Sequence, residues 1–141
     1  MKYTIALCIL LFSLMIISCK ETKKTIKVSS NEFYSGKYEI KNLNGNELSR
    51  DLSFTIETLK NKISGKTDCN SYFGTYSVSK NELDIGPLGA TEMYCEDNVM
   101  KTERELFKAY SDSKTFNFDG KMLTLFNEGG TLLIRAYKIS K

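Results

Sequence analysis

The chain has 141 residues and a mass of 16.0 kDa, which is enough for one domain and little else. The 20 Lys and Arg residues against 17 Asp and Glu residues give a net charge of +3, too small an excess to indicate a nucleic-acid partner. There is no His, so the most common acid–base group and the most common metal ligand are missing. Composition therefore disfavours an enzyme and a metal site, and it implies no cofactor.

Residues 1–18 have the form of a bacterial lipoprotein signal peptide. A basic start at Lys2 precedes an almost wholly apolar run, 5–17, which is the length of a signal h-region and shorter than the ~20 residues of a transmembrane helix. The run ends in Ile-Ile-Ser-Cys, which resembles a lipobox and implies cleavage before Cys19 and acylation of that cysteine. The alternative is an ordinary secretory signal that Cys19 happens to follow.

Residues 19–31 are predicted to be a flexible tether, because they are charged and offer little to bury. Acyl chains on Cys19 would anchor the protein in a membrane, since each buried methylene contributes about 0.8 kcal/mol. Lys20 does not resemble the aspartate signal for inner-membrane retention, so the expected location is the outer membrane of the cell envelope. Residues 32–141 remain for the folded domain.

Most of that domain shows the period-two alternation of β-strands. Tyr38 and Ile40 should point to the same side of the first strand, and Asn44-Gly45 is a strong signal for a two-residue hairpin turn. The expected strands are 33–40, 52–58, 62–65, 72–78, 83–85, 116–118, 122–126 and 131–137.

Between Cys95 and Lys114 the apolar residues recur instead with the period of a helix. Glu96-Asp97-Asn98 offer capping side chains at its N-terminus, and Glu103, with other charged residues, is assigned to the solvent face. The chain is therefore predicted to be mainly β, an antiparallel barrel-like sheet of about eight short strands with one α-helix inserted before the last three strands.

Cys69 and Cys95 are the cysteines left within the domain after export. An exported compartment permits disulfides, and the even count leaves no thiol over. A bridge closing a loop of about 26 residues would stabilise the fold by roughly 3–4 kcal/mol in the loop-entropy model. A reactive thiol usually needs a neighbouring His or a C-x-x-C pair, and neither is present. A structural disulfide is the prediction, and two unpaired thiols are the alternative.

Several short motifs occur at characteristic separations. They are Gly65-x-x-x-Cys69-Asn70-x-x-x-Gly74-x-Tyr76, Leu83-x-Ile85-Gly86-Pro87-Leu88, Thr91-x-Met93-x-Cys95, Glu103-x-x-Leu106-Phe107 and a closing hairpin with Leu123-x-Leu125 and Leu132-Leu133. Together they resemble the META domain, the small domain of HslJ-like heat-shock lipoproteins. The resemblance implies a barrel-like β fold with one helix, an envelope location and an association with heat shock and novobiocin tolerance. It supplies no catalytic residues.

The motif residues have structural interpretations. Asn70 is typical of a turn, and the Thr91 hydroxyl is expected to satisfy buried backbone near the helix start. Acid–base pairs such as Glu103 with Glu105, or Asp68 with Glu92, are better explained as solvated charges. A second interpretation concerns ligands, because small barrels can hold one small molecule. Its candidate lining residues are Tyr72, Tyr76, Tyr94 and Arg135, with Phe73, Tyr110 and Tyr137, and their alternative role is in the core or at its rim.

The sequence thus predicts a membrane-anchored, non-enzymatic envelope lipoprotein that serves as a stress-tolerance or accessory binding factor. One alternative is a barrel that binds a small hydrophobic ligand, which requires an interior cavity. Another is an inhibitor or accessory subunit of an envelope protein, which requires an exposed apolar patch. The expected partners are the membrane, through Cys19, and either an envelope protein or a small hydrophobic ligand.

Overall fold

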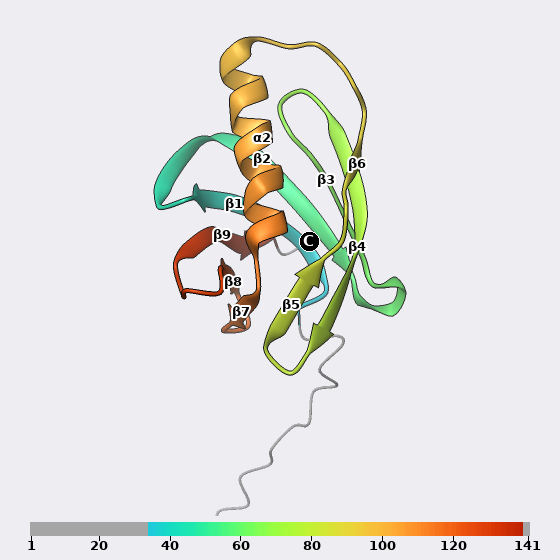
Figure 1. Cartoon of the computed structure of the whole chain (residues 1–141), viewed down its shortest axis with the longest axis vertical. Helices are drawn as coiled ribbons and strands as arrows, with labels where there is room; N and C mark the ends of the chain where they lie inside the picture. Colours follow the sequence, from blue (N-terminus) through green and yellow to red (C-terminus); the bar gives the residue numbers. More distant parts are fainter. Residues whose placement is uncertain (1–33, 140–141) are drawn as a thin grey trace, which may run out of the picture.

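The computed structural model describes residues 34–139 (Figure 1). The predicted signal peptide, the predicted tether and the predicted acylation site at Cys19 lie outside the described residues. Within that range the strands are β1 (Gly36–Leu43), β2 (Asn46–Glu57), β3 (Lys62–Lys66), β4 (Ser71–Ser79), β5 (Glu82–Ile85), β6 (Gly89–Ala90), β7 (Thr115–Phe118), β8 (Met122–Phe126) and β9 (Leu132–Lys138). The helix α2 (Asp97–Asp112) precedes the last three strands, and a 3-10 turn, η1 (Thr58–Lys60), joins β2 to β3.

The strands form a closed antiparallel barrel, as the sequence predicted. Their order is β3-β2-β1-β9-β8-β7-β5-β4, and pairing of β3 with β4 completes the ring of eight. The shortest strand pairing in the ring is between β5 and β7. There Glu82 faces Thr115, and the Leu83 N–H donates to the Lys114 carbonyl at 2.8 Å. The two-residue strand β6 pairs with β4 beside β5 and was not predicted, because two residues show no period.

Alternation and turn chemistry explain the first hairpin. Tyr38 and Ile40 are both fully buried on the inner face of β1. Asn44 and Gly45 form the turn with φ of 52° and 84°, the left-handed geometry of a two-residue hairpin. The turn pairs Leu43 directly with Asn46, so β2 begins six residues before the predicted strand.

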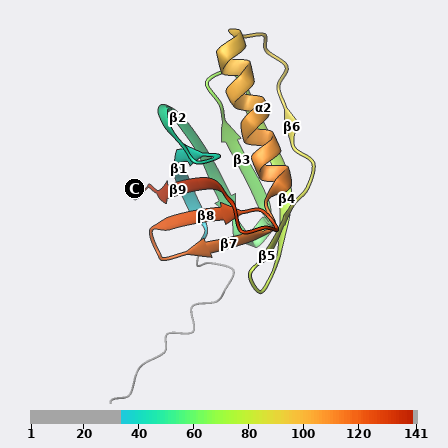
Figure 2. The ribbon, with the colours of Figure 1, turned by 60° about the vertical axis from the view of Figure 1, so that its left-hand side comes forward.

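The helix α2 lies across one opening of the barrel (Figure 2). It contacts β1 and β5, which are on opposite sides of the ring, and buries Leu106, Ala109 and Tyr110. The predicted side-chain cap is wrong, because Glu96 precedes the helix without a side-chain cap hydrogen bond. Instead the Glu96 carbonyl accepts from the N–H groups of Val99 and Met100, each at 3.0 Å.

Aromatic side chains fill the interior beneath α2. Phe54 stacks on Tyr38 with ring centroids 5.2 Å apart and meets Tyr110 edge-on at 5.9 Å. The hydroxyls of Tyr72 and Tyr110 are hydrogen-bonded at 2.9 Å, and burial raises the pKa of both phenols. A cavity of about 20 Å³ remains at the other end of the barrel. It has room for about one water molecule, so the barrel is a packed core in this conformation.

Candidate functional site

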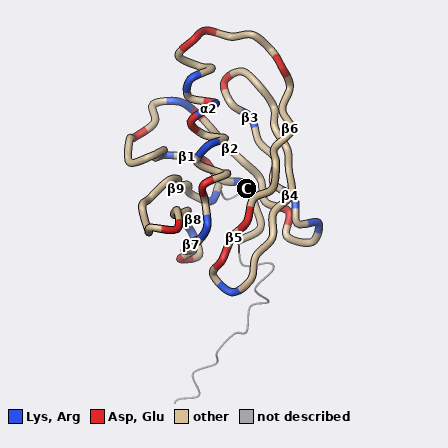
Figure 3. The backbone as a smooth tube through the Cα atoms, viewed as in Figure 1, with Lys and Arg blue, Asp and Glu red and all other residues tan. Residues whose placement is uncertain are grey.

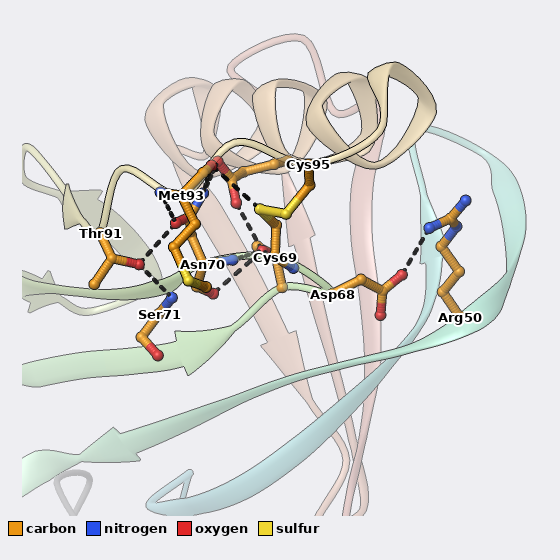
Figure 4. The surroundings of a disulfide bond; sticks show 10 residues. Arg50, Asp68, Cys69, Asn70, Ser71, Thr91, Met93 and Cys95 are labelled. Carbon is orange, nitrogen blue, oxygen red and sulfur yellow. Dashed lines mark hydrogen bonds and ion pairs between the residues drawn. A yellow bond between two sulfur atoms is a disulfide. The ribbon is translucent and has the colours of Figure 1, made fainter.

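Three segments that are far apart in the sequence meet at the start of β4 (Figure 4). They are the loop between β3 and β4, the segment 91–96 that leads from β6 to α2, and the first half of α2. Cys69 and Cys95 are joined by a disulfide with their Cα atoms 6.1 Å apart, as expected from the sequence. We call this site the Asn70 junction. Its members are Thr67, Cys69, Asn70, Thr91, Met93, Cys95 and Glu103.

The buried side chain of Asn70 lies at its centre, 2% exposed. Its Oδ1 accepts from the Thr91 hydroxyl at 2.7 Å and from the Met93 N–H at 2.9 Å. Its Nδ2 donates to Glu103 Oε1 at 3.0 Å. One amide side chain therefore ties the segment 91–96 and the helix to the barrel, which is more than the turn-forming role predicted for it.

Glu103 corrects an expectation of the sequence. It was assigned to the solvent face of the helix, but it is 6% exposed. Its Oε2 lies 2.6 Å from the Thr67 hydroxyl, and its Oε1 accepts from Asn70. Within the described residues no Lys or Arg forms an ion pair with this carboxylate. Its burial therefore depends on two neutral hydrogen-bond donors.

Thr67 shapes the loop and was not singled out from the sequence. Its Oγ1 accepts from the N–H groups of Cys69 at 3.1 Å and Asn70 at 2.7 Å, while its own N–H donates to the Asn70 carbonyl at 2.8 Å. The Thr91 hydroxyl also bonds to backbone, but at the start of β4 and not near the helix start: its Oγ1 accepts from the N–H of the exposed residue Ser71 at 3.2 Å. These side chains replace regular sheet pairing where the chain turns.

The junction holds the backbone of the segment 91–96 and leaves its largest side chains outside. The Thr91 N–H donates to the Ser71 carbonyl at 3.0 Å, Met93 is held by Asn70, and Cys95 is held by the disulfide. Met93 is nevertheless 54% exposed and Tyr94 is 90% exposed. The two side chains line an open groove together with Met100 and the polar residues Asn70, Thr91, Glu92 and Glu103. The arrangement is a fixed loop that presents an apolar surface.

The glycines of the motif pack against neighbouring elements. A Cβ on Gly65 would lie 2.5 Å from the Tyr72 ring and from the Ser53 carbonyl oxygen, so β3 has no room for a side chain there. A Cβ on Gly74 would lie 2.6 Å from the Leu88 side chain. Gly65 thus allows Tyr72 to reach Tyr110 under the helix.

The predicted ligand-lining residues do not form one pocket. Tyr72 and Tyr76 are buried, the former under α2 and the latter beside the small cavity at the other end of the barrel. Tyr94 is in the exposed loop. Arg135 lies on β9 opposite Asn42 and Thr124, half-buried, and its Nε has no hydrogen-bond partner in the described part of the chain. Of the other aromatic candidates, Tyr110 is in the core, whereas Phe73 and Tyr137 are exposed.

Two of the acidic candidates have basic partners. Asp68 forms an ion pair with Arg50 at 2.9 Å, and Glu105 lies 3.9 Å from Lys101. Among residues 34–139 no group of three or more Cys, Asp or Glu side chains could hold a metal ion. No helix in the same range is long and apolar enough to cross a membrane.

Known structures share this fold. A protein from Burkholderia xenovorans, solved by NMR, has 19% sequence identity and a TM-score of 0.58, covering 76% of this chain and 83% of its own. A crystal structure of a DUF4847 family protein from Bacteroides vulgatus has 13% identity and a TM-score of 0.59, covering 78% and 96%. At these identities the likeness shows the fold alone.

The search of curated proteins gave no match to the chain. The family model of the META domain matches residues 31–138, which include every strand and the helix. This agrees with the resemblance seen in the motifs around Asn70 and Cys95. The protein therefore belongs to the META domain family.

Proposed function

We propose that the protein is a lipid-anchored accessory factor of the bacterial envelope that acts without catalysis, by binding a protein partner through the segment 91–96. The observation that carries this proposal is the fixed backbone of that segment beneath the exposed side chains of Met93 and Tyr94. The acyl chains on Cys19 would hold the domain at the outer membrane, and its role would be in stress tolerance. The anchor and this role rest on the sequence alone.

Preorganisation favours binding by such a loop. A flexible segment loses conformational freedom when a partner orders it, and this cost reduces its affinity. Here the disulfide and Asn70 have already fixed the backbone, so less freedom remains to be lost. Tyr and Met are also enriched in the buried centres of protein interfaces. The segment therefore combines a low ordering cost with side chains that can fill a partner's pocket.

The charges around the loop indicate the kind of partner. Residues 88–100 contain no Lys or Arg, while Glu92, Glu96 and Asp97 are exposed along the same segment (Figure 3). Complementary charge around an interface steers association and disfavours wrong partners. We therefore expect a partner with an apolar pocket surrounded by basic residues.

The ligand-binding alternative has less support as a main function. The interior leaves about 20 Å³, far below the roughly 150 Å³ of a cavity that binds benzene. The exposed apolar side chains that an accessory subunit needs are present at Met93 and Tyr94. The geometry therefore favours a protein partner.

Replacing Cys19 with alanine is expected to move the protein from the membrane fraction to the soluble fraction. The physical reason is that no acyl chain would remain to partition into the bilayer. Fractionation of cells that express the wild type and the variant at equal levels would measure the shift. An unchanged distribution would contradict the anchor.

A photo-crosslinking residue at position 94 is expected to capture a recurrent envelope protein, because Tyr94 would lie within the interface. The matched control is position 59, since Leu59 in η1 is 88% exposed but is not part of the Asn70 junction. Mass spectrometry of the products would identify the captured proteins. Equal yields of the same products from both positions would show that the capture reflects exposure and not recognition.

A further inference from the structure

The turn that joins β2 to β3 presents a leucine to solvent. Leu59, in η1, is 88% exposed, although the backbone on both sides of it is held. Thr58 is buried, the Asn61 N–H donates to the Thr58 carbonyl at 3.3 Å, and the Asn61 carbonyl accepts from the Tyr76 N–H at 3.0 Å. Leu59 therefore projects from a turn that is fixed to the barrel wall, and its side chain is available for a contact outside the domain.

Basic residues surround this exposed leucine. Lys60 follows it directly and Lys62 is the first residue of β3, and both are exposed. Lys37, also exposed, is at the start of β1, the strand that pairs with the end of β2. The one acid of the turn is Glu57, which faces Lys62 and forms an ion pair with Lys60 at 2.7 Å. Lysines therefore outnumber acids around an apolar tip.

The chain enters the barrel beside the same turn. Gly36, the first residue of β1, pairs with Ile56, and the Ser35 hydroxyl donates to the Ile56 carbonyl at 3.2 Å. Only 14 residues lie between Cys19 and Tyr34. A chain of that length spans at most about 50 Å even when it is fully extended. An anchor at Cys19 would therefore keep this end of the domain close to the membrane.

The opposite end of the domain has the opposite charge. β3 begins just after η1 and ends just before Thr67, so the β2–β3 turn and the Asn70 junction are at the two ends of that strand (Figure 1). At the junction end, residues 88–100 contain no Lys or Arg and include Glu92, Glu96 and Asp97. An anionic bilayer attracts lysines near its surface and repels acidic groups. The charges therefore favour one orientation of the domain, with the β2–β3 turn towards the lipid.

We propose that the β2–β3 turn is a membrane-contact surface, in which Leu59 enters the interfacial region of an anionic bilayer and Lys60 and Lys62 contact the headgroup phosphates. The surface rests on the proposed acylation of Cys19, because the anchor brings lipid to it. A short tether gives a local concentration in the millimolar range, so one leucine and a few lysines are sufficient for contact. A protein partner would need a pocket shaped for the leucine, whereas a bilayer does not.

This contact deepens the proposed function, because it turns the exposed side chains of Met93 and Tyr94 away from the membrane. A protein partner can then reach them without competing with lipid. In this orientation a photo-crosslinking residue at position 59 captures lipid, so it remains a control for the proteins captured at position 94.

Tryptophan fluorescence tests the contact, since the chain has no Trp of its own. Leu59→Trp and its matched control Tyr94→Trp each place one reporter at a position of nearly equal exposure, at opposite ends of the domain. The mature acylated proteins are reconstituted into vesicles of phosphatidylethanolamine and phosphatidylglycerol with brominated acyl chains, which quench Trp on contact. The emission of Leu59→Trp is expected to shift to shorter wavelength and to be quenched severalfold more strongly than that of Tyr94→Trp.

Two changes show whether the lysines hold the contact. Replacing Lys60 and Lys62 with glutamine in the Leu59→Trp protein should weaken the contact by about fivefold for each lysine and restore most of the emission. Replacing phosphatidylglycerol with phosphatidylcholine in the vesicles should have the same effect. Quenching that survives both changes would exclude the recognition of anionic lipid by this turn.

Equal quenching of Leu59→Trp and Tyr94→Trp would overturn the proposal, because the domain would then have no preferred face towards the bilayer. The intact mass of the reconstituted protein separates the two ways of failing. A protein without acyl chains would refute the anchor and this surface with it, whereas an acylated protein with equal quenching would refute the surface alone. The protein-binding loop is tested independently, since a failure to capture a partner at position 94 leaves the quenching of Leu59→Trp unchanged.

Discussion

Replacing Asn70 with alanine should lower the free energy of unfolding by about 3 kcal/mol, an effect large for a single polar side chain. The variant loses the hydrogen bonds to Thr91 and Met93 and leaves Glu103 Oε1 without its amide donor. A buried carboxylate with an unsatisfied oxygen carries most of this cost. Urea denaturation with linear extrapolation would measure it.

Two further variants show whether the cost comes from the network. Asn117→Ala removes an exposed asparagine from β7 and should change stability by no more than about 0.5 kcal/mol. Asn70→Asp keeps the shape but places a second carboxylate against Glu103. The folded variant should then bind a proton more tightly than the unfolded chain does, so its stability should rise as the pH is lowered from about 7 to about 5. A loss below about 1 kcal/mol for Asn70→Ala would contradict the central role of this side chain.

Replacing both Cys69 and Cys95 with serine should cost roughly 3–4 kcal/mol, which is a substantial share of the 5–15 kcal/mol typical of a domain. The bond closes a loop with a sequence separation of 26, so its loss gives conformational freedom back to the unfolded chain. The wild type in excess dithiothreitol should unfold at the same urea concentration as the double variant. If both proteins were as stable as the oxidised wild type, the bridge would not contribute to the stability of the fold.

Local pattern was sufficient for most of the fold. Alternation placed Tyr38 and Ile40 on the same side of their strand, Asn44-Gly45 marked the hairpin, and the change of period marked α2. Strand ends were less accurate, as at β2, because a tight hairpin continues pairing through residues that show no alternation. Each of these features depends on residues that are close in the sequence, which explains why it could be predicted.

The polar contacts of the site could not be predicted in the same way. Charge and helical position assigned Glu103 to the solvent, yet its donors come from Thr67 and Asn70, on a loop far from it in the sequence. Periodicity separates apolar from polar positions, but it does not show which polar groups find buried partners. The sequence did offer one signal for a structural role of Glu103. This residue begins the motif Glu103-x-x-Leu106-Phe107, which it shares with two apolar residues of the helix. The exposure of Met93 and Tyr94 was likewise not predicted, and the contact that holds their backbone, from the Met93 N–H to Asn70, joins residues far apart in the sequence.

The pairing of β1 with β9 has a consequence for the kinetics of folding. Ile40 faces Leu52 of its own hairpin on one side and Ala136, near the other end of the chain, on the other. Hairpins form quickly because their ends are close, whereas contacts of high sequence separation require a large loss of chain entropy before they stabilise anything. The step that joins the first strand to the last is therefore expected to limit the folding rate, and a truncation that removes β9 would leave an open sheet with two unpaired edges.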